Sequence, residues 1–241
     1  MKALPSLPNG RAPSEPVVYV VDDDVGMNDA VQDLLRSVGL RTRAFLSADA
    51  FLAASLDTAP GCVVMDVRLR GTNGLDVQRE MERRGMCLPV VFITGHGDIE
   101  MSVRAMKAGA VDFLPKPFRD QDLLDAVAEG IAADRKKRHV LQCSDDLRSR
   151  LATLSDRERE VMTLAASGLM NKQIAATIGI SEVTIKIHRS RAMRKMAART
   201  FADLVKMALE LEMPLLLRET ASAGSSRRER GATPQWAAPG Y

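Results

Sequence analysis

The chain has 241 residues, of which 46% are hydrophobic and 27% are charged, and its formal net charge is +3. These fractions are ordinary for a globular protein, and no run approaches the roughly 18 consecutive apolar residues that a membrane helix needs. Residues 1–16 lack the apolar centre of a signal peptide, so we expect a cytoplasmic protein with no membrane partner. Three cysteines without a CxxC pair argue against a disulfide or metal framework.

Strand and helix patterns alternate through the first half of the chain. A leader at residues 1–15, rich in Pro, Gly and Ser, is expected to be disordered. The predicted strands are Val17–Val21, Arg41–Phe45, Cys62–Met65, Val90–Thr94 and Val111–Leu114. The predicted helices are Asn28–Val38, Ala48–Leu56, Leu75–Arg84, Ile99–Ala108 and Asp120–Ala133. Because parallel strands need long crossovers, this order predicts an α/β domain at residues 16–133 with a doubly wound, flavodoxin-like, five-stranded parallel sheet.

A different pattern follows this predicted domain. The apolar periodicity fades at residues 134–150, where charge dominates, and we interpret this segment as a linker with room to extend the preceding helix. Four short helical patterns follow, and their expected capping residues are Ser155 with Glu158, Asn171, Ser181, and Thr200 with Asp203. We therefore predict an all-α, four-helix domain at residues 151–213 and a disordered tail at residues 214–241, which contains Trp236.

Charge is distributed unevenly between the two predicted domains. From Val17 to Ile131 there are 12 Lys and Arg against 18 Asp and Glu, a balance of −6. From Ser181 to Arg199 there are six Lys and Arg against one Glu, a balance of +5. A short basic helix after an acidic domain indicates a nucleic-acid-binding element, although a charge run is more commonly a solvated helix face.

Acidic and polar residues follow the predicted strands at their carboxyl ends, where ligands bind in doubly wound sheets. The first strand runs into Asp22 and Asp23, the third ends at Asp66, the fourth at Thr94, and Lys116 follows the fifth. Converging carboxylates need a cation, and their hard oxygens suit Mg²⁺. A carboxylate beside Mg²⁺ can take a phosphoryl group, whose oxygens a hydroxyl and an ammonium can bind. Taken singly, each of these residues is also consistent with a helix cap or a loop. Their combination at the strand ends favours a phosphorylation site.

The stretches VVYVVDDD, CVVMD, VVFITGHGD and AGAVDFLPKPF resemble a receiver domain of the FixJ type over about residues 16–133. The resemblance implies that Asp66 is the phospho-acceptor. It also implies that Asp23, Asp66 and the backbone carbonyl of Arg68 hold Mg²⁺, with Asp22 acting through water.

Further residues of the FixJ-type pattern are present, with one departure. Thr94 and Lys116 are similar to the family's conserved hydroxyl and lysine, and Phe113 is similar to the aromatic switch residue that reorients when the hydroxyl moves. After the acceptor the family commonly reads Asp-x-x-Met-Pro, whereas this chain has Leu69 and Arg70. Arg70 in place of Pro loosens the loop and adds a charge near the phosphorylation site, which puts the acyl-phosphate lifetime in doubt.

The basic segment has the pattern of the second helix of a helix-turn-helix. Its inward stripe is Ile185, His188, Ala192 and Met196. The opposite face, which can enter a major groove, is Lys186, Ile187, Ser190 and Arg194. The flanking cations, placed for DNA phosphates, are Arg189, Arg191 and Lys195. LSxRExxV and VTIKIHRSRAMRKM resemble the LuxR-type DNA-binding domain, which implies that Lys186 and Ile187 lie near base edges. Ser190 replaces a residue that is often basic in the family, so sequence specificity does not carry over.

The leading hypothesis is a response regulator of a two-component system, not an enzyme. A histidine kinase phosphorylates Asp66, which controls homodimerisation and sequence-specific binding to double-stranded DNA, with RNA polymerase as a further partner. The resemblance implies that the dimer forms through the predicted fourth helix, fifth strand and fifth helix.

Three alternatives stay open. A Mg²⁺-dependent phosphohydrolase would carry a DxDxT motif on the first strand, where this chain has three aspartates and Val25. A LuxR-type sensor of small molecules needs an aromatic pocket, and Tyr19 is the one Tyr or Trp at residues 17–133. Against a phosphorylation-independent pseudo-receiver stand Asp66, Thr94 and Lys116.

Overall fold

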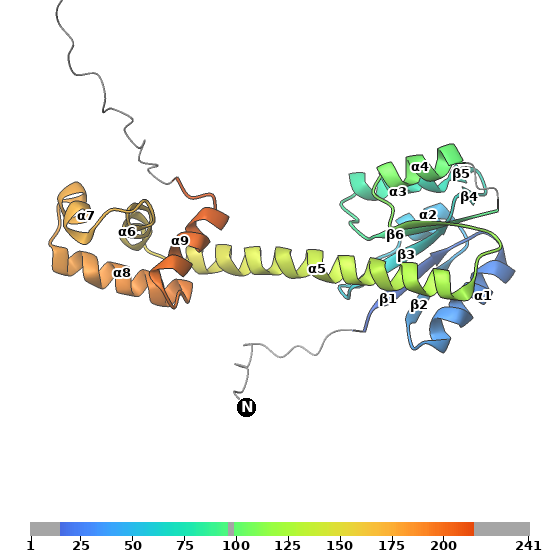
Figure 1. Cartoon of the computed structure of the whole chain (residues 1–241), viewed down its shortest axis with the longest axis horizontal. Helices are drawn as coiled ribbons and strands as arrows, with labels where there is room; N and C mark the ends of the chain where they lie inside the picture. Colours follow the sequence, from blue (N-terminus) through green and yellow to red (C-terminus); the bar gives the residue numbers. More distant parts are fainter. Residues whose placement is uncertain (1–14, 96–98, 215–241) are drawn as a thin grey trace, which may run out of the picture. The chain divides into compact units, whose positions relative to one another are not determined.

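The structure is a computed structural model that describes residues 15–95 and 99–214, and the chain divides into two compact units, Met1–Cys143 and Ser144–Tyr241 (Figure 1). The predicted disordered leader and tail lie almost wholly outside the described residues, and so does Trp236. Among the described helices, none is both long enough and apolar enough to cross a membrane.

The first unit contains the predicted five-stranded parallel sheet. Its strands are β1 (Val17–Val21), β2 (Arg41–Phe45), β3 (Gly61–Asp66), β6 (Val90–Thr94) and β7 (Asp112–Pro115). Their order is β2-β1-β3-β6-β7, and every neighbouring pair is parallel. The sequence did not predict a short antiparallel pair after β3, which consists of β4 (Arg68–Leu69) and β5 (Thr72–Asn73). The doubly wound α/β fold is confirmed.

Helices cover both faces of this sheet (Figure 1). The helices on one face are α2 (Ala48–Leu52), α3 (Gly74–Arg83) and α4 (Ile99–Lys107), and those on the other are α1 (Val25–Ser37) and α5 (Asp120–Ala152). Alternate strand residues point to opposite faces, so Tyr19 packs with the first group and Val20 with the second. Because both faces are covered, every residue of β1 and β3 is buried, as expected for parallel strands.

Helices α1 and α2 begin or end away from the predicted residues. Helix α1 begins at Val25 rather than at Asn28, because the Asp24 side chain accepts a hydrogen bond from the Met27 N–H at 3.1 Å and caps the helix earlier. Helix α2 ends at Leu52 rather than at Leu56.

Helix α5 continues through the segment that was predicted as a linker. It runs to Ala152, so the division between the two units falls within this helix. Asp134 is only 2% exposed and accepts hydrogen bonds from the Gly61 N–H at 2.8 Å and from Arg138 Nε at 2.6 Å. Arg138 also donates to the Thr58 carbonyl. These polar contacts, which apolar periodicity does not report, hold the helix on the sheet beyond Ala133.

The second unit contains the end of α5 and four further helices, α6 (Asp156–Ala166), α7 (Asn171–Ile178), α8 (Glu182–Met196) and α9 (Phe201–Glu210). The caps predicted at Ser155, Ser181 and Thr200 are confirmed. The cap predicted at Asn171 is wrong. Met170 precedes the helix and its N–H donates to Gln173 Oε1, whereas Asn171 is already helical.

Candidate functional site

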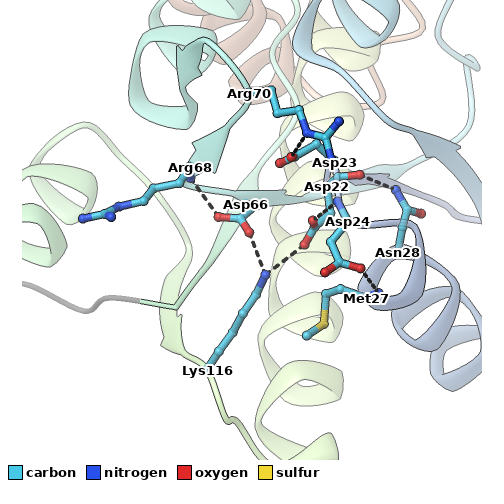
Figure 2. A network of polar contacts seen from close by, with 9 residues as sticks. All are labelled: Asp22, Asp23, Asp24, Met27, Asn28, Asp66, Arg68, Arg70 and Lys116. Atoms are coloured by element: carbon cyan, nitrogen blue, oxygen red, sulfur yellow. Dashed lines mark hydrogen bonds and ion pairs between the residues drawn. The ribbon is translucent and has the colours of Figure 1, made fainter.

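An acidic pocket lies at the carboxyl ends of β1 and β3, where the strand order reverses. Val21 pairs with Met65, so the next residues, Asp22 and Asp66, lie side by side at the ends of these two strands. Lys116 follows β7, and its Nζ lies 2.9 Å from Asp22 Oδ2 and 2.6 Å from Asp66 Oδ2 (Figure 2). The structure therefore brings together three of the predicted site residues.

Burial sets the electrostatics of this pocket. Asp22 is fully buried, and this burial raises the pKa of its carboxyl against the opposing effects of the Asp24 N–H and of Lys116. Burial also works against the charged amine of Lys116, but hydrogen bonds to Asp66 and Asp22 outweigh it and raise the pKa of Lys116. The amine therefore stays protonated between two carboxylates.

Backbone N–H groups orient the two carboxylates, and a buried amide holds the backbone at Asp22. The Arg68 N–H donates to Asp66 Oδ1 at 2.8 Å, and the Asp24 N–H donates to Asp22 Oδ1 at 2.9 Å. On α1, buried Asn28 donates to the carbonyls of Asp22 and Phe45, both at 3.0 Å. Asn28 is not among the predicted site residues, and its local signal is a polar side chain on the buried face of α1, a signal that Gln32 shares.

Gly74 is a second residue that the sequence analysis missed. A Cβ at this position would lie 2.6 Å from the Asp66 carbonyl oxygen and 3.1 Å from the Phe92 ring. A side chain here would push α3 away from the backbone of Asp66.

Asp23 and Asp24 point to other partners. Asp23 Oδ2 accepts a hydrogen bond from Arg70 Nε at 2.9 Å, and Asp24 caps α1 (Figure 2). Within residues 15–95 and 99–214, no group of three or more His, Cys, Asp and Glu side chains is arranged to hold a metal ion. The oxygens of Asp22, Asp23 and Asp66 have the chemistry that Mg²⁺ prefers, and one of them, Asp23 Oδ2, is bonded to Arg70.

The predicted switch residues lie on the two neighbouring strands. Thr94 is fully buried at the end of β6, and its carbonyl accepts the Lys116 N–H at 2.7 Å. Phe113, on β7, is half-buried against the core on the α2–α4 face of the sheet. A backbone hydrogen bond therefore connects Thr94 to the residue that holds Asp66.

Helix α8 has the two faces that its periodicity predicted. Ile185, Ala192 and Met196 are fully buried, and His188 is half-buried. The residues predicted for the groove-facing side are all exposed, namely Lys186, Ile187, Ser190 and Arg194. Arg191 is exposed beside them.

The other two predicted phosphate contacts are engaged inside the unit. Arg189 donates to Asn171 Oδ1 at 3.1 Å, and its guanidinium carbon lies 4.3 Å from the centroid of the Phe201 ring. Lys195 Nζ lies 2.6 Å from Glu158 Oε2 and 2.9 Å from the Thr153 carbonyl. Lys195 lowers the pKa of the buried Glu158, and the Ser155 N–H adds to this effect. These two cations hold α8 against its neighbours.

A doubly wound sheet with a carboxylate–lysine pocket at its switch point, in one chain with a helix-turn-helix unit, defines the class of response regulators. Residues 18–128 match the family model for the response regulator receiver domain, and residues 152–208 match the one for bacterial regulatory proteins of the luxR family. The chain therefore belongs to the FixJ-type family of two-component response regulators, which regulate transcription.

Named relatives agree with this assignment over most of the chain. The chain is 51% identical to nodulation protein W of Bradyrhizobium diazoefficiens, over 82% of its own length and 87% of that protein. It is 40% identical to the transcriptional regulatory protein FixJ of Azorhizobium caulinodans, over 80% of its own length and 91% of that protein. Among solved structures, the response regulator StyR is 43% identical with a TM-score of 0.76, over 82% of this chain and 100% of that one. Full-length FixJ from B. japonicum is 40% identical with a TM-score of 0.50, over 82% of this chain and 97% of that one.

Proposed function

We propose that Asp66 accepts a phosphoryl group from a histidine kinase, and that this transfer controls dimerisation and DNA binding. The observation that carries the proposal is the Asp66 carboxylate, fixed by the Arg68 N–H and by Lys116 Nζ beside the buried Asp22. A nucleophile held at two points loses little further freedom when it reacts.

In the proposed transfer, an Asp66 carboxylate oxygen attacks phosphorus, the phosphorus–nitrogen bond of the kinase phosphohistidine breaks, and the histidine leaves. Lys116, 2.6 Å from Asp66 Oδ2, is placed to pair with the phosphoryl oxygens. Mg²⁺, when bound by Asp23, Asp66 and the Arg68 carbonyl with Asp22 acting through water, supplies positive charge to the phosphoryl group. The reaction modifies the protein once and is not a catalytic turnover, so we do not class the chain as an enzyme.

We propose that the signal leaves the pocket through Thr94. Its hydroxyl binds a phosphoryl oxygen, the end of β6 moves, and Phe113 turns into the space that is released. This movement reshapes the surface of α4, β7 and α5, where a second copy binds. Support comes from the position of Thr94 next to the Lys116 backbone and from the half-buried state of Phe113.

For the DNA-binding part, we propose that exposed Lys186, Ile187, Ser190 and Arg194 enter the major groove and that Arg191 contacts phosphate. Arg189 and Lys195 orient α8, because their charged groups already have partners in the unit. Residues 16–133 then form the receiver and residues 151–213 the DNA-binding domain, joined by 134–150, which are helical. We further propose RNA polymerase as a partner and the cytoplasm as the location.

Intact-mass analysis tests the acceptor. After incubation with Mg²⁺ and acetyl phosphate, the wild-type chain is expected to gain one phosphoryl group, and Asp66→Asn is expected to gain none. Asp24→Asn is the matched control, because it removes a neighbouring carboxylate while Asn remains a good helix cap. An unmodified wild-type chain, or a modified Asp66→Asn chain, would contradict the assignment.

Sedimentation tests the proposed switch separately. Phosphorylated wild-type protein is expected to dimerise and to bind an operator with two half-sites ~10²-fold more tightly, because the second half-site contact becomes intramolecular. Thr94→Ala is expected to accept phosphate and remain monomeric. Monomeric phosphorylated wild type would refute this step and leave the acceptor assignment intact.

A further inference from the structure

Arg70 stands at the tip of the small hairpin beside the acidic pocket. Leu69 pairs with Thr72, so Arg70 and Gly71 form a two-residue turn, and Gly71 has a positive φ of 79°, which glycine adopts without steric cost. The hairpin follows Asp66 directly and holds the Arg70 guanidinium on Asp23, with Nε 2.9 Å from Oδ2 (Figure 2). The Arg70 side chain is 86% exposed, and that of Asp23 is 20% exposed.

The three carboxylates near the pocket pair with two different cations, one enclosed and one exposed. Asp22 and Asp66 share Lys116, which is enclosed by the pocket, whereas Asp23 is paired with a long side chain that reaches in from solvent. Asp23 is also a carboxylate that the proposed magnesium site needs, and its Oδ2 is bonded to Arg70. Mg²⁺ binds carboxylate oxygen at about 2.1 Å in a compact octahedral shell. A guanidinium on the same oxygen would add a second positive charge within a few ångströms, and two cations so close repel each other.

We propose that Arg70 is a built-in competitor of Mg²⁺. It occupies Asp23 in the metal-free protein, moves into solvent when Mg²⁺ binds, and thereby raises the magnesium concentration at which the pocket becomes competent for phosphorylation. The inference rests on the proposed magnesium site. Exposed ion pairs are individually weak, so Arg70 tunes the affinity for Mg²⁺ without blocking the site.

A thermal-shift titration of the full-length chain tests the competition. The melting temperature is followed against MgCl₂ at constant ionic strength, and the midpoint gives the apparent Kd. Arg70→Ala is expected to bind Mg²⁺ about two- to fivefold more tightly than the wild type, the range that an exposed ion pair supplies. Arg70→Lys keeps the charge without the guanidinium fork and is expected to bind with an affinity between those of the wild type and Arg70→Ala.

Arg119→Ala is the matched control. Arg119 lies just before α5 and its side chain is 84% exposed, but its partner is Asp122 in the first turn of α5. Its removal changes the net charge equally and leaves Asp23 untouched, so a wild-type affinity for Mg²⁺ is expected. If Arg119→Ala and Arg70→Ala raise the affinity for Mg²⁺ equally, the change in net charge explains the effect, and the inference is overturned.

A second measurement follows the ion pair itself. The side-chain Nε–H signal of Arg70 in a ¹H–¹⁵N NMR spectrum, assigned by its absence in Arg70→Lys, is expected to shift with the same Mg²⁺ midpoint as the melting temperature. An unmoved signal, or wild-type affinity in Arg70→Ala while Asp23→Ala loses Mg²⁺ binding, would refute the competition alone. A wild-type chain without any saturable Mg²⁺ response would remove the proposed metal site together with it.

Discussion

Lys195→Ala separates a structural cation from a DNA contact on the same helix. The substitution removes the 2.6 Å ion pair to Glu158 and the 2.9 Å bond to the Thr153 carbonyl. Glu158 has a side chain only 5% exposed and keeps the Ser155 N–H as a partner, so its charge is left poorly compensated. Hydrogen bonds to charged groups contribute about 1.5–3 kcal/mol, and Lys195 is 35% exposed, which reduces the value through solvent screening. We therefore expect a loss of about 2 kcal/mol in the unfolding free energy.

Calorimetry of the full-length chain measures this loss. For a unit of this size, about 2 kcal/mol corresponds to a melting temperature lower by roughly 8–16 °C. The transition of the unit that contains α6–α9 is expected to move, and the other is expected to stay. Below that transition, operator affinity and its salt dependence should match the wild type. The control Arg191→Ala, an exposed neighbour, should leave the melting temperature unchanged and weaken DNA binding.

A different result would support the prediction from charge and spacing that Lys195 contacts a DNA phosphate. If Lys195→Ala melts like the wild type while the slope of log K against log salt falls by about one, then Lys195 contacts a phosphate. In that case the contact with Glu158 would contribute little to stability.

Three further outcomes are expected. At pH 7 without Mg²⁺, Asp22→Asn should melt above the wild type. Burial raises the pKa of the Asp22 carboxyl, so its ionisation destabilises the fold as the pH rises through that pKa, and a neutral Asn side chain avoids this cost. A melting temperature below that of the wild type would contradict the prediction. Lys186→Ala should weaken binding to the cognate operator more than to random DNA, and Arg191→Ala should weaken both equally; the reverse pattern in competition assays would exchange the two faces. The lowered pKa of Glu158 stabilises its unit above the ordinary glutamate pKa, so this stability should fall below about pH 4.3, and acid titration of Glu158→Gln should show a shallower loss.

The pocket could be located from the sequence because parallel strands end at one edge of the sheet. Asp66 and Lys116 lie 50 residues apart in the chain, yet both follow strands whose carboxyl ends meet at one edge, which predicts that they lie together. The 2.6 Å between Lys116 Nζ and Asp66 Oδ2 agrees with this prediction. The inward stripe of α8 followed equally directly from spacings of three and four residues. Both inferences use backbone geometry, which a local pattern specifies.

Polar partnerships over long sequence distances could not be inferred in this way. Nothing in the local sequence indicates that Lys195 binds Glu158, 37 residues earlier, or that Asp134 binds Gly61, 73 residues earlier. A charged side chain has the same local pattern whether it faces solvent, a phosphate or a buried carboxylate. For the same physical reason, the sequence predicts residues 134–150 as a linker with room to extend the preceding helix, and Lys195 as a contact to DNA phosphate.

The hydrogen bonds of Asp134 also determine where the chain can be divided. A fragment that stops at Ala133 lacks the acceptor of the buried Gly61 N–H, and an amide left without a partner costs about 1–3 kcal/mol. A fragment that ends beyond Arg138 keeps this bond and the one to the Thr58 carbonyl. For this chain, the natural cutting point for a separately expressed sheet unit therefore lies one to two helical turns after the end of its apolar pattern.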